Sequence, residues 1–326
     1  MSNITSLAYS FSVTIGKVYR NVIYKMIQYF IIFRNLFTLQ ISTVAPTEDI
    51  FAEAAERQRE RKEQLEKYCL EHVDQNPQPK IKQLWQLLFD DDNKYIYCAV
   101  PKSASTPMKK TLLKLRNDSK QYKKRSPHEP SLWKHMSEYN ESENSKRLQT
   151  HFKFLFVREP FHRLLSAYLD KLFDSDKDYS NRLRQLIVKT YRPEDMEEVS
   201  TESNNVTFTE FLRFIVTSSN FYARDDHWRQ YEHLCFPCFF KFDFIGHFET
   251  LADDINYVLK EAGFYKNVTF PPFHSSRVSS TFLTYYSQVP QEIIFRLGEA
   301  FRNDFEMFGY PFPGPLKSLL GNYTSA

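Results

Sequence analysis

The chain has 326 residues, of which 42% are hydrophobic and 25% are charged, and this suits one large globular domain with a tail or two small domains. Its 43 basic and 40 acidic residues leave a formal net charge of +3. This nearly equal number of basic and acidic residues argues against a protein that binds nucleic acid. An anion-binding site in this chain must therefore be a local cluster of residues.

The N-terminal region has an apolar segment. Residues 22–45 are rich in Ile, Phe and Leu and follow two basic residues, which is the order expected of a signal anchor with its basic side in the cytoplasm. Lys25 and Arg34 interrupt the run, so an amphipathic or disordered leader is the alternative. We interpret residues 1–45 as a cytoplasmic tail and possible signal anchor.

A charged segment follows. From Glu48 to Glu71 the sequence is mainly Ala, Glu, Arg and Lys, with apolar residues mostly at its two ends. This pattern predicts a solvated helix that serves as a stem and ends before the Asn76-Pro77-Gln78-Pro79 break. We therefore place a stem at residues 46–80 and a lumenal globular domain at residues 81–326.

The globular domain opens with a strand, a turn and a helix. Residues 95–100 form a short apolar and aromatic run, which predicts a buried strand. Residues 101–105 are expected to form a loop. A helix should follow over residues 106–115, with Thr106 as its N-cap and Pro107 at the first helical position.

The same pattern returns after a polar stretch, residues 117–147, that we expect to run over the surface. Residues 152–157 predict a strand, residues 158–160 a turn and residues 161–173 a helix. Two such units predict an α/β fold with a central parallel sheet flanked by helices, and with ligands at the carboxyl ends of the strands. Further helices are expected at 181–191, 207–218, 249–262 and 289–304.

The first loop is a candidate anion site. A helix N-terminus offers free N–H groups and a partial positive charge, which suit a phosphate or sulfate. Lys109 lies near that terminus, where the helix dipole disfavours a cation unless an anion binds there. An ordinary loop capped by Ser or Thr is the alternative. The loop contains no glycine and lacks the Walker A pattern, so a nucleoside triphosphatase or kinase-like protein is disfavoured.

The second candidate anion site follows the second strand. Arg158 ends that strand, and Arg163 and Ser166 lie on the helix after it. An Arg side chain can bind a phosphate through two parallel hydrogen bonds. Arg163 and Ser166 could equally be ordinary residues of the helix surface. Because both candidate sites occupy the same place in the repeated pattern, one bisphosphorylated nucleotide could span them.

The cysteines and glycosylation sequons bear on the compartment. Four cysteines permit two disulfides, with three possible pairings, in an oxidising compartment. A zinc site is disfavoured because only one close pair exists, and we expect no metal. The cysteines are Cys69, Cys98, Cys235 and Cys238, and the sequon asparagines are Asn117, Asn140, Asn205, Asn267 and Asn322.

Two long motifs carry a resemblance to a known family. Residues 100–110 (VPKSASTPMKK) resemble VPKVGCTSWKR, the loop that grips the 5′-phosphosulfate in Golgi carbohydrate sulfotransferases such as the chondroitin and dermatan 4-O-sulfotransferases. Residues 156–172 (FVREPFHRLLSAYLDKL) resemble FVRDPFERLLSAYRDKF, the 3′-phosphate motif of that family. The resemblance runs from about Lys67 to Pro313. Ser105 and the Pro107-Met108 pair depart from the family pattern.

That resemblance implies a sulfotransferase fold, which is P-loop-like and binds 3′-phosphoadenylyl sulfate (PAPS). It implies transfer of a sulfuryl group to a sugar hydroxyl of a glycan or proteoglycan chain, by a single-pass type II protein of the Golgi membrane. A relative that binds PAPS or glycans without turnover is the alternative. The implied cofactor-binding residues are Pro101, Lys102, Ser103, Ala104, Ser105, Thr106, Pro107, Lys109, Arg158, Arg163 and Ser166.

Two residues are expected to take part in catalysis. Lys102 would lie on the oxygens of the 5′-phosphate. His227 is the candidate general base, because a histidine pKa lies near working pH and because the neighbouring Trp228 could stack on a sugar face. A structural role for His227, with Glu249 or another carboxylate as the base, is the alternative.

Overall fold

The structure is a computed structural model, and its described residues belong to one compact unit that begins at Glu48. The predicted anchor within residues 22–45 lies outside them. Among the helices described, none has both the length and the apolar character needed to span a bilayer. The described residues are 48–320 without 74–77, 117–124, 176, 194–204, 220, 265–269 and 271–276.

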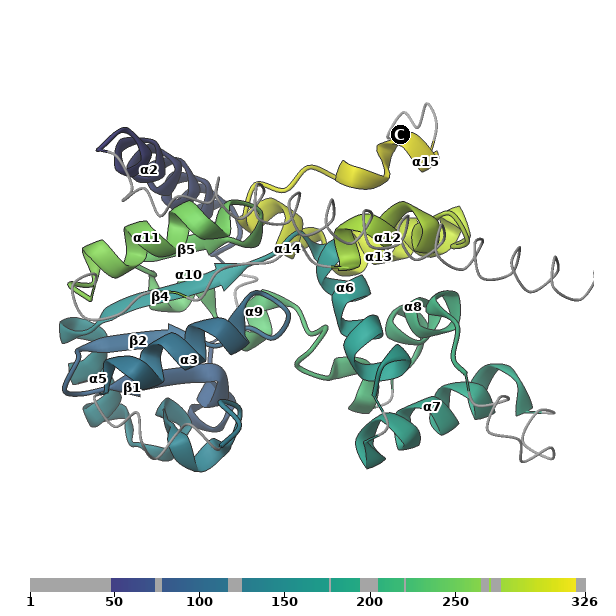
Figure 1. The fold of residues 1–326 in the computed structure, drawn as a ribbon, viewed down its shortest axis with the longest axis horizontal. Helices are drawn as coiled ribbons and strands as arrows, with labels where there is room; N and C mark the ends of the chain where they lie inside the picture. The colour runs from purple at the N-terminus through teal and green to yellow at the C-terminus, as the bar shows by residue number, and fades with distance from the viewer. Residues whose placement is uncertain are drawn as a thin grey trace, which may run out of the picture. The chain divides into compact units, whose positions relative to one another are not determined.

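A five-stranded sheet, in the order β3-β1-β2-β4-β5, forms the centre of this unit (Figure 1). Its inner strands β2, β4 and β5 are parallel, as the sequence predicts. The sheet is nevertheless mixed, because β1 pairs antiparallel with both β2 and β3. Only four residues separate β1 from β2, and so short a link permits an antiparallel pair but not a parallel one. The strands are β1 Leu87–Asp90, β2 Tyr95–Cys98, β3 Lys134–His135, β4 Phe152–Val157 and β5 Phe244–His247.

Successive side chains of the strands pack on opposite faces of the sheet. On one face, Tyr97 and Phe154 lie in a cluster with α3 (Ser105–Leu115) and α11 (Leu251–Glu261). On the other face, Leu155 clusters with residues of α9 (Tyr231–Leu234), α10 (Pro237–Phe240) and α14 (Arg302–Met307). Both faces are therefore covered, which explains the nearly continuous apolar runs of β2 and β4.

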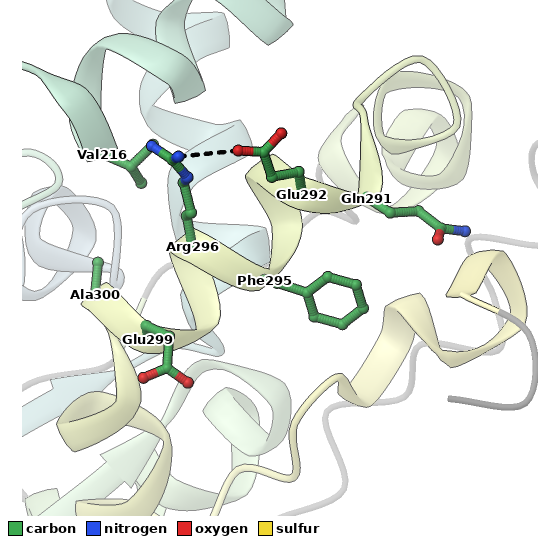
Figure 2. A pocket seen from close by; sticks show the side chains of 7 residues that line it. All are labelled: Val216, Gln291, Glu292, Phe295, Arg296, Glu299 and Ala300. Carbon is green, nitrogen blue, oxygen red and sulfur yellow. Dashed lines mark ion pairs between the residues drawn. The ribbon is translucent and has the colours of Figure 1, made fainter. Parts of the chain in front are cut away.

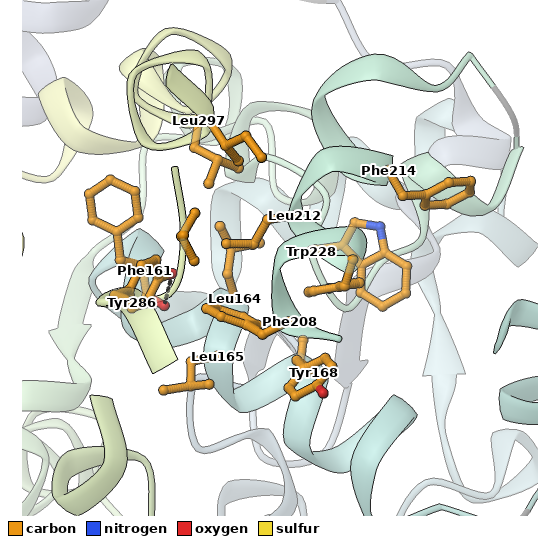
Figure 3. Close-up of a cluster of buried hydrophobic side chains, with 14 of the residues drawn as sticks. Phe161, Leu164, Leu165, Tyr168, Phe208, Leu212, Phe214, Trp228, Tyr286 and Leu297 are labelled. Carbon is orange, nitrogen blue, oxygen red and sulfur yellow. Dashed lines mark hydrogen bonds between the residues drawn. The ribbon is translucent and has the colours of Figure 1, made fainter. Parts of the chain in front are cut away.

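A third core belongs to the helices that follow β4 (Figure 3). The apolar face of α6, which includes the predicted Leu164 and Tyr168, packs against the aromatic residues of neighbouring helices. The predicted helix over 161–173 is present, although its last turn is the π-helix η5 (Leu169–Phe173). The helices of this core include α6 Pro160–Tyr168, α7 Asp178–Tyr191, α8 Phe208–Thr217, α12 Arg277–Tyr286 and α13 Gln291–Ala300.

Helix α2 (Glu48–Glu71) has the predicted bounds but is not a solvated stem. The buried Gln58 donates a hydrogen bond from Nε2 to the carbonyl of Ile245 (2.7 Å) and accepts one at Oε1 from its N–H (2.9 Å). Ile245 lies on β5, the edge strand, whose outer backbone groups need partners. A disulfide joins Cys69 to Cys238 of α10. The helix thus packs on the domain and covers the open edge of its sheet.

The polar stretch 117–147 also differs from the prediction. Rather than only crossing the surface, its described part supplies strand β3, the buried Trp133 and Met136, and most of α5 (Glu141–Thr150). Asn140 caps α5 by accepting a hydrogen bond from the N–H of Glu143 (3.0 Å). The remaining short elements are α15 Lys317–Leu320 and the 3₁₀-helices η2 Ile81–Gln86, η3 Pro130–Leu132, η4 Met136–Glu138, η7 Phe221–Arg224, η8 Phe248–Thr250 and η9 Gly314–Leu316.

Candidate active site

The carboxyl ends of the three parallel strands meet at one place. Nη1 of Arg158, after β4, donates to the carbonyl of Lys102, after β2 (3.3 Å). The Arg158 guanidinium also lies over the ring of Phe248, after β5, at 3.9 Å from its centroid. The two predicted anion turns are therefore neighbours, because parallel strands bring their carboxyl ends to the same edge of the sheet.

The first turn is tighter than the sequence predicts. Lys102 and Ala104 have left-handed backbone, with φ of 69° and 61°. This tight turn lets α3 begin at Ser105 with Ala104 at the N-cap position, so the prediction of Thr106 as N-cap is wrong. Pro107 is the third helical residue rather than the first. It still lies in the first turn, where backbone N–H groups have no acceptor within the helix.

The polar side chains of this turn fall into two groups. Ser103 is buried, and its hydroxyl lies 3.3 Å from that of Tyr231, so this side chain already has a partner within the protein. Thr106 is exposed, and its Oγ1 lies 2.8 Å from Nε2 of His128. Burial lowers the pKa of the Lys109 ammonium to about 8. Thr106 and Lys109 stay predicted contacts of the anion.

Lys102 is held by an ion pair. Its Nζ lies 3.1 Å from Oδ2 of Asp170, and Nζ of Lys171 lies 3.2 Å from the same oxygen. Burial lowers the pKa of Lys102, and the charge of Asp170 opposes that effect. The carboxylate of Asp170 therefore holds two ammonium groups beside the first turn.

Arg158 is a deeply buried cation at the strand ends. Its residue is 3% exposed, and within the described part of the chain its Nε has no hydrogen-bond partner. Burial lowers the pKa of this guanidinium, while Glu249 opposes the shift. A buried N–H without an acceptor is costly. An anionic ligand would supply the missing acceptor, so the site fits a bound phosphate.

Arg163, a predicted cofactor contact, is bound by backbone carbonyl groups of the protein. It is 1% exposed, and its guanidinium donates to three backbone carbonyls, those of Pro101 (3.2 Å), Asp226 (3.2 Å) and Arg229 (2.7 Å). The side chain of Arg163 therefore joins the first turn to the segment that contains Asp226 and Arg229. Ser166, half-buried on α6, stays a predicted cofactor contact.

His227 forms a pair with a carboxylate that the sequence did not single out. Nδ1 of His227 lies 2.6 Å from Oδ1 of Asp225, and Oδ2 of Asp225 accepts a hydrogen bond from the hydroxyl of Tyr179 (2.6 Å). Although burial opposes it, the hydrogen bond from His227 lowers the pKa of Asp225. An aspartate two residues before the histidine was the signal available in the sequence. Such a carboxylate can fix the orientation and tautomer of a basic imidazole.

Trp228 does not have the predicted place on a sugar face. It is 1% exposed, lies in the helical core, and donates from Nε1 to the carbonyl of Ala223 (3.2 Å). Glu249, the alternative base, has both carboxylate oxygens occupied, one by the N–H of Glu159 (3.0 Å) and one by the hydroxyl of Tyr310 (2.9 Å). These contacts favour His227 over Glu249.

His128 was also missed by the sequence analysis. Desolvation by the surrounding protein, together with the charges of Lys109, Lys171 and His227, lowers the pKa of His128. The hydrogen bond between His128 and Thr106 joins residues that no local pattern in the sequence pairs.

The cysteines form two disulfides, Cys69 with Cys238 and Cys98 with Cys235. The second ties the end of β2, which leads into the first turn, to the segment after α9. Among the described residues, no group of three or more His, Cys, Asp or Glu side chains is placed to hold a metal. Two sequon residues are described, and both are exposed: Asn140 and Asn205.

A separate surface pocket of about 880 Å³ lies along α13 (Figure 2). Its lining includes Phe295 and Arg296, and the latter forms an ion pair with Glu292 (2.9 Å). None of the described site residues lines it. The strand ends, and not this pocket, therefore form the candidate active site.

Comparison with known proteins identifies the family of the chain. The profile of the sulfotransferase family matches residues 85–311. Carbohydrate sulfotransferase 14 of Danio rerio is 34% identical over 235 residues, which cover 71% of this chain and 63% of the relative. Carbohydrate sulfotransferase 11 of Danio rerio is 31% identical, over a match that covers 83% of this chain and 81% of the relative. Carbohydrate sulfotransferase 10 of Homo sapiens is 30% identical, over a match that covers 78% of this chain and 76% of the relative.

No solved structure matches the chain at a significant level. The family profile spans both anion turns and the segment of His227, so the match includes the whole candidate site. The chain therefore belongs to the sulfotransferase family of PAPS-dependent enzymes, and the relatives that it matches are carbohydrate sulfotransferases.

Proposed function

We propose that the chain transfers a sulfuryl group from PAPS to a sugar hydroxyl of a glycan or proteoglycan chain. The observation that carries this proposal is the meeting of two anion-binding turns at the ends of β2 and β4, where the buried Nε of Arg158 has no protein partner among the described residues. The relatives, whose names describe carbohydrate sulfotransferases, support the class of acceptor.

The donor would be held at both of its phosphate ends. Lys102, Thr106 and Lys109 would bind the 5′-phosphosulfate beside the N-terminus of α3, and Arg158 with Ser166 would bind the 3′-phosphate. When bound, PAPS supplies an activated sulfuryl group: the acceptor oxygen bonds to sulfur while the bond from sulfur to the 5′-phosphate oxygen breaks, and adenosine 3′,5′-bisphosphate leaves with that electron pair. Lys102 would stabilise the negative charge that grows on the leaving oxygen.

His227 would take the proton of the acceptor hydroxyl. Its hydrogen bond to Asp225 favours the tautomer with the proton on Nδ1, which leaves Nε2 free to act as the base. The imidazolium formed would be stabilised by the carboxylate of Asp225. Because Tyr179 donates to the other oxygen of Asp225, the orientation of the pair is fixed from both sides.

We infer that the catalytic domain faces the Golgi lumen, on a type II protein anchored within residues 22–45. Disulfides persist in oxidising compartments and are rare in the cytosol, and both pairs of cysteines bond in this structure. The exposed sequon residues Asn140 and Asn205 fit the same compartment. The test is alkylation of freshly isolated protein without reductant. Free thiols at all four cysteines would contradict a lumenal domain.

Incubation of the purified full chain with radiolabelled PAPS and a panel of glycans tests the activity. We expect release of adenosine 3′,5′-bisphosphate together with label on at least one glycan, and both at least about 10²-fold slower with the Arg158→Ala variant. Tight binding of the bisphosphate without label on any glycan would favour the alternative, a relative without catalytic activity. Failure to bind the bisphosphate at all would contradict the proposed function.

A further inference from the structure

Tyr231, the first residue of α9, contacts both anion turns through one buried hydroxyl. The hydroxyl donates to the carbonyl of Arg158 (2.9 Å) and accepts a hydrogen bond from the N–H of the same residue (2.8 Å). It also lies 3.3 Å from Oγ of Ser103, in the first turn. Arg158 and Ser103 belong to turns that follow different strands, so a single atom joins the two ends of the site.

These contacts use the whole capacity of the hydroxyl. A tyrosine O–H donates one hydrogen bond and accepts two. The carbonyl of Arg158 takes the proton, the N–H of Arg158 occupies one lone pair, and the Ser103 hydroxyl can donate to the other. Tyr231 is also 0% exposed. It is therefore not a group that contacts substrate, and its effect on the reaction must act through the turns.

The position of Tyr231 is itself fixed from several sides. Its backbone N–H donates to Oδ1 of the buried Asp304 (2.9 Å). Its ring lies under the guanidinium of Arg163 (4.6 Å to the centroid) and against the edge of Phe308 (5.1 Å between centroids). Arg163 in turn donates to the carbonyl of Pro101, at the start of the first turn. The ring and the hydroxyl thus belong to one rigid support beneath the site.

We propose that Tyr231 is a positioning residue that couples the 5′-phosphosulfate turn to the 3′-phosphate turn, so that a bisphosphorylated nucleotide meets both in register. This inference rests on the proposed function, because it assigns one end of the nucleotide to each turn. A ligand that binds both turns has a higher affinity when the turns are already aligned, because binding then costs no free energy for ordering them. A ligand that binds only one turn gains nothing from it.

The test compares ligands that engage one turn or both. Calorimetry would give the affinities of the full-length wild type and of Tyr231→Phe for adenosine 3′,5′-bisphosphate, adenosine 5′-monophosphate and adenosine 3′-monophosphate. The phenylalanine ring keeps the packing on Arg163 and removes only the hydroxyl. We expect the advantage of the bisphosphate over the better monophosphate to fall about tenfold, the equivalent of one or two lost hydrogen bonds. The affinities for the monophosphates should change much less.

Tyr286→Phe is the matched control. Tyr286 is also buried, at 1% exposed, and its hydroxyl donates to the carbonyl of Phe161 on α6 (2.8 Å). Both variants should lower the unfolding temperature, but only Tyr231→Phe should reduce the bisphosphate advantage. An unchanged advantage in Tyr231→Phe, or an equal loss in Tyr286→Phe, would overturn the inference.

Ser103→Ala is the second variant, for use if Tyr231→Phe does not fold. It removes the contact from the first turn and leaves both bonds to Arg158 in place. A smaller fall in the same ratio supports the coupling, and an unchanged ratio overturns it. A wild type without affinity for the bisphosphate would instead remove the proposed function, and the inference with it. Binding of the bisphosphate to the wild type is therefore measured before any variant is made.

Discussion

Replacing Gln58 by alanine tests the conclusion that α2 is part of the catalytic domain. The Gln58 amide forms a pair of hydrogen bonds with the backbone of Ile245, on the edge strand β5. In the variant, the carbonyl of Ile245 still accepts a hydrogen bond from Nη1 of Arg61 (3.0 Å). The N–H of Ile245 loses its side-chain partner in a place where Gln58 itself is only 5% exposed.

The expected loss of stability follows from these contacts. Each lost hydrogen bond costs about 0.5–1.5 kcal/mol, and a stranded buried N–H group costs about 1–3 kcal/mol. Because these contributions overlap, we expect the free energy of unfolding to fall by about 2–4 kcal/mol. For a domain of this size, that corresponds to a fall in the unfolding temperature of roughly 3–7 °C.

Thermal and urea unfolding of purified protein would measure this loss. Gln64→Ala is the control on the same helix, because Nε2 of Gln64 donates to the carbonyl of Glu306 (2.7 Å) at an exposed site. Its free energy of unfolding should change by no more than about 0.5 kcal/mol. If Gln58→Ala loses no more stability than Gln64→Ala, α2 does not protect the sheet edge and the stem interpretation is restored.

Three further predictions concern the site. Lys102→Ala and Arg158→Ala should each lower sulfuryl transfer about 10²–10³-fold with unchanged circular dichroism, and near-full activity of either variant would contradict its role. The pKa of Lys109 is lowered to about 8 by burial, so this cation is present below that pH and lost above it. Bisphosphate affinity should therefore weaken as pH rises through 8, and Lys109→Arg should flatten the titration. Asp225→Asn should lower turnover by about 10²-fold or more without weakening bisphosphate binding, and retained turnover would exclude the pairing with His227 as catalytic.

Local sequence determined the elements that hold the anion turns. The apolar run at 152–157 and the 3.6-residue spacing after it predict β4 and α6 with nearly the observed bounds, because strand and helix periodicity are local properties. The proximity of Lys102 and Arg158 also follows from the sequence, since both come after parallel strands. The sequence alone therefore places these two residues in one site.

Only the tertiary structure decided what each polar side chain contacts. Arg163 and Trp228 stand in motifs that suggest ligand contact, yet both are buried against protein. The Cys98–Cys235 pairing and the contact of Tyr231 with Arg158 likewise join distant segments.

The charged α2 looks like a solvated helix because hydrogen-bonding residues suit water and a strand edge equally well. Gln58 finds its partner at Ile245, 187 residues away. A polar side chain can form its hydrogen bonds with water or with backbone groups far away in the sequence. The sequence pattern is the same in both cases, and only the folded structure distinguishes them.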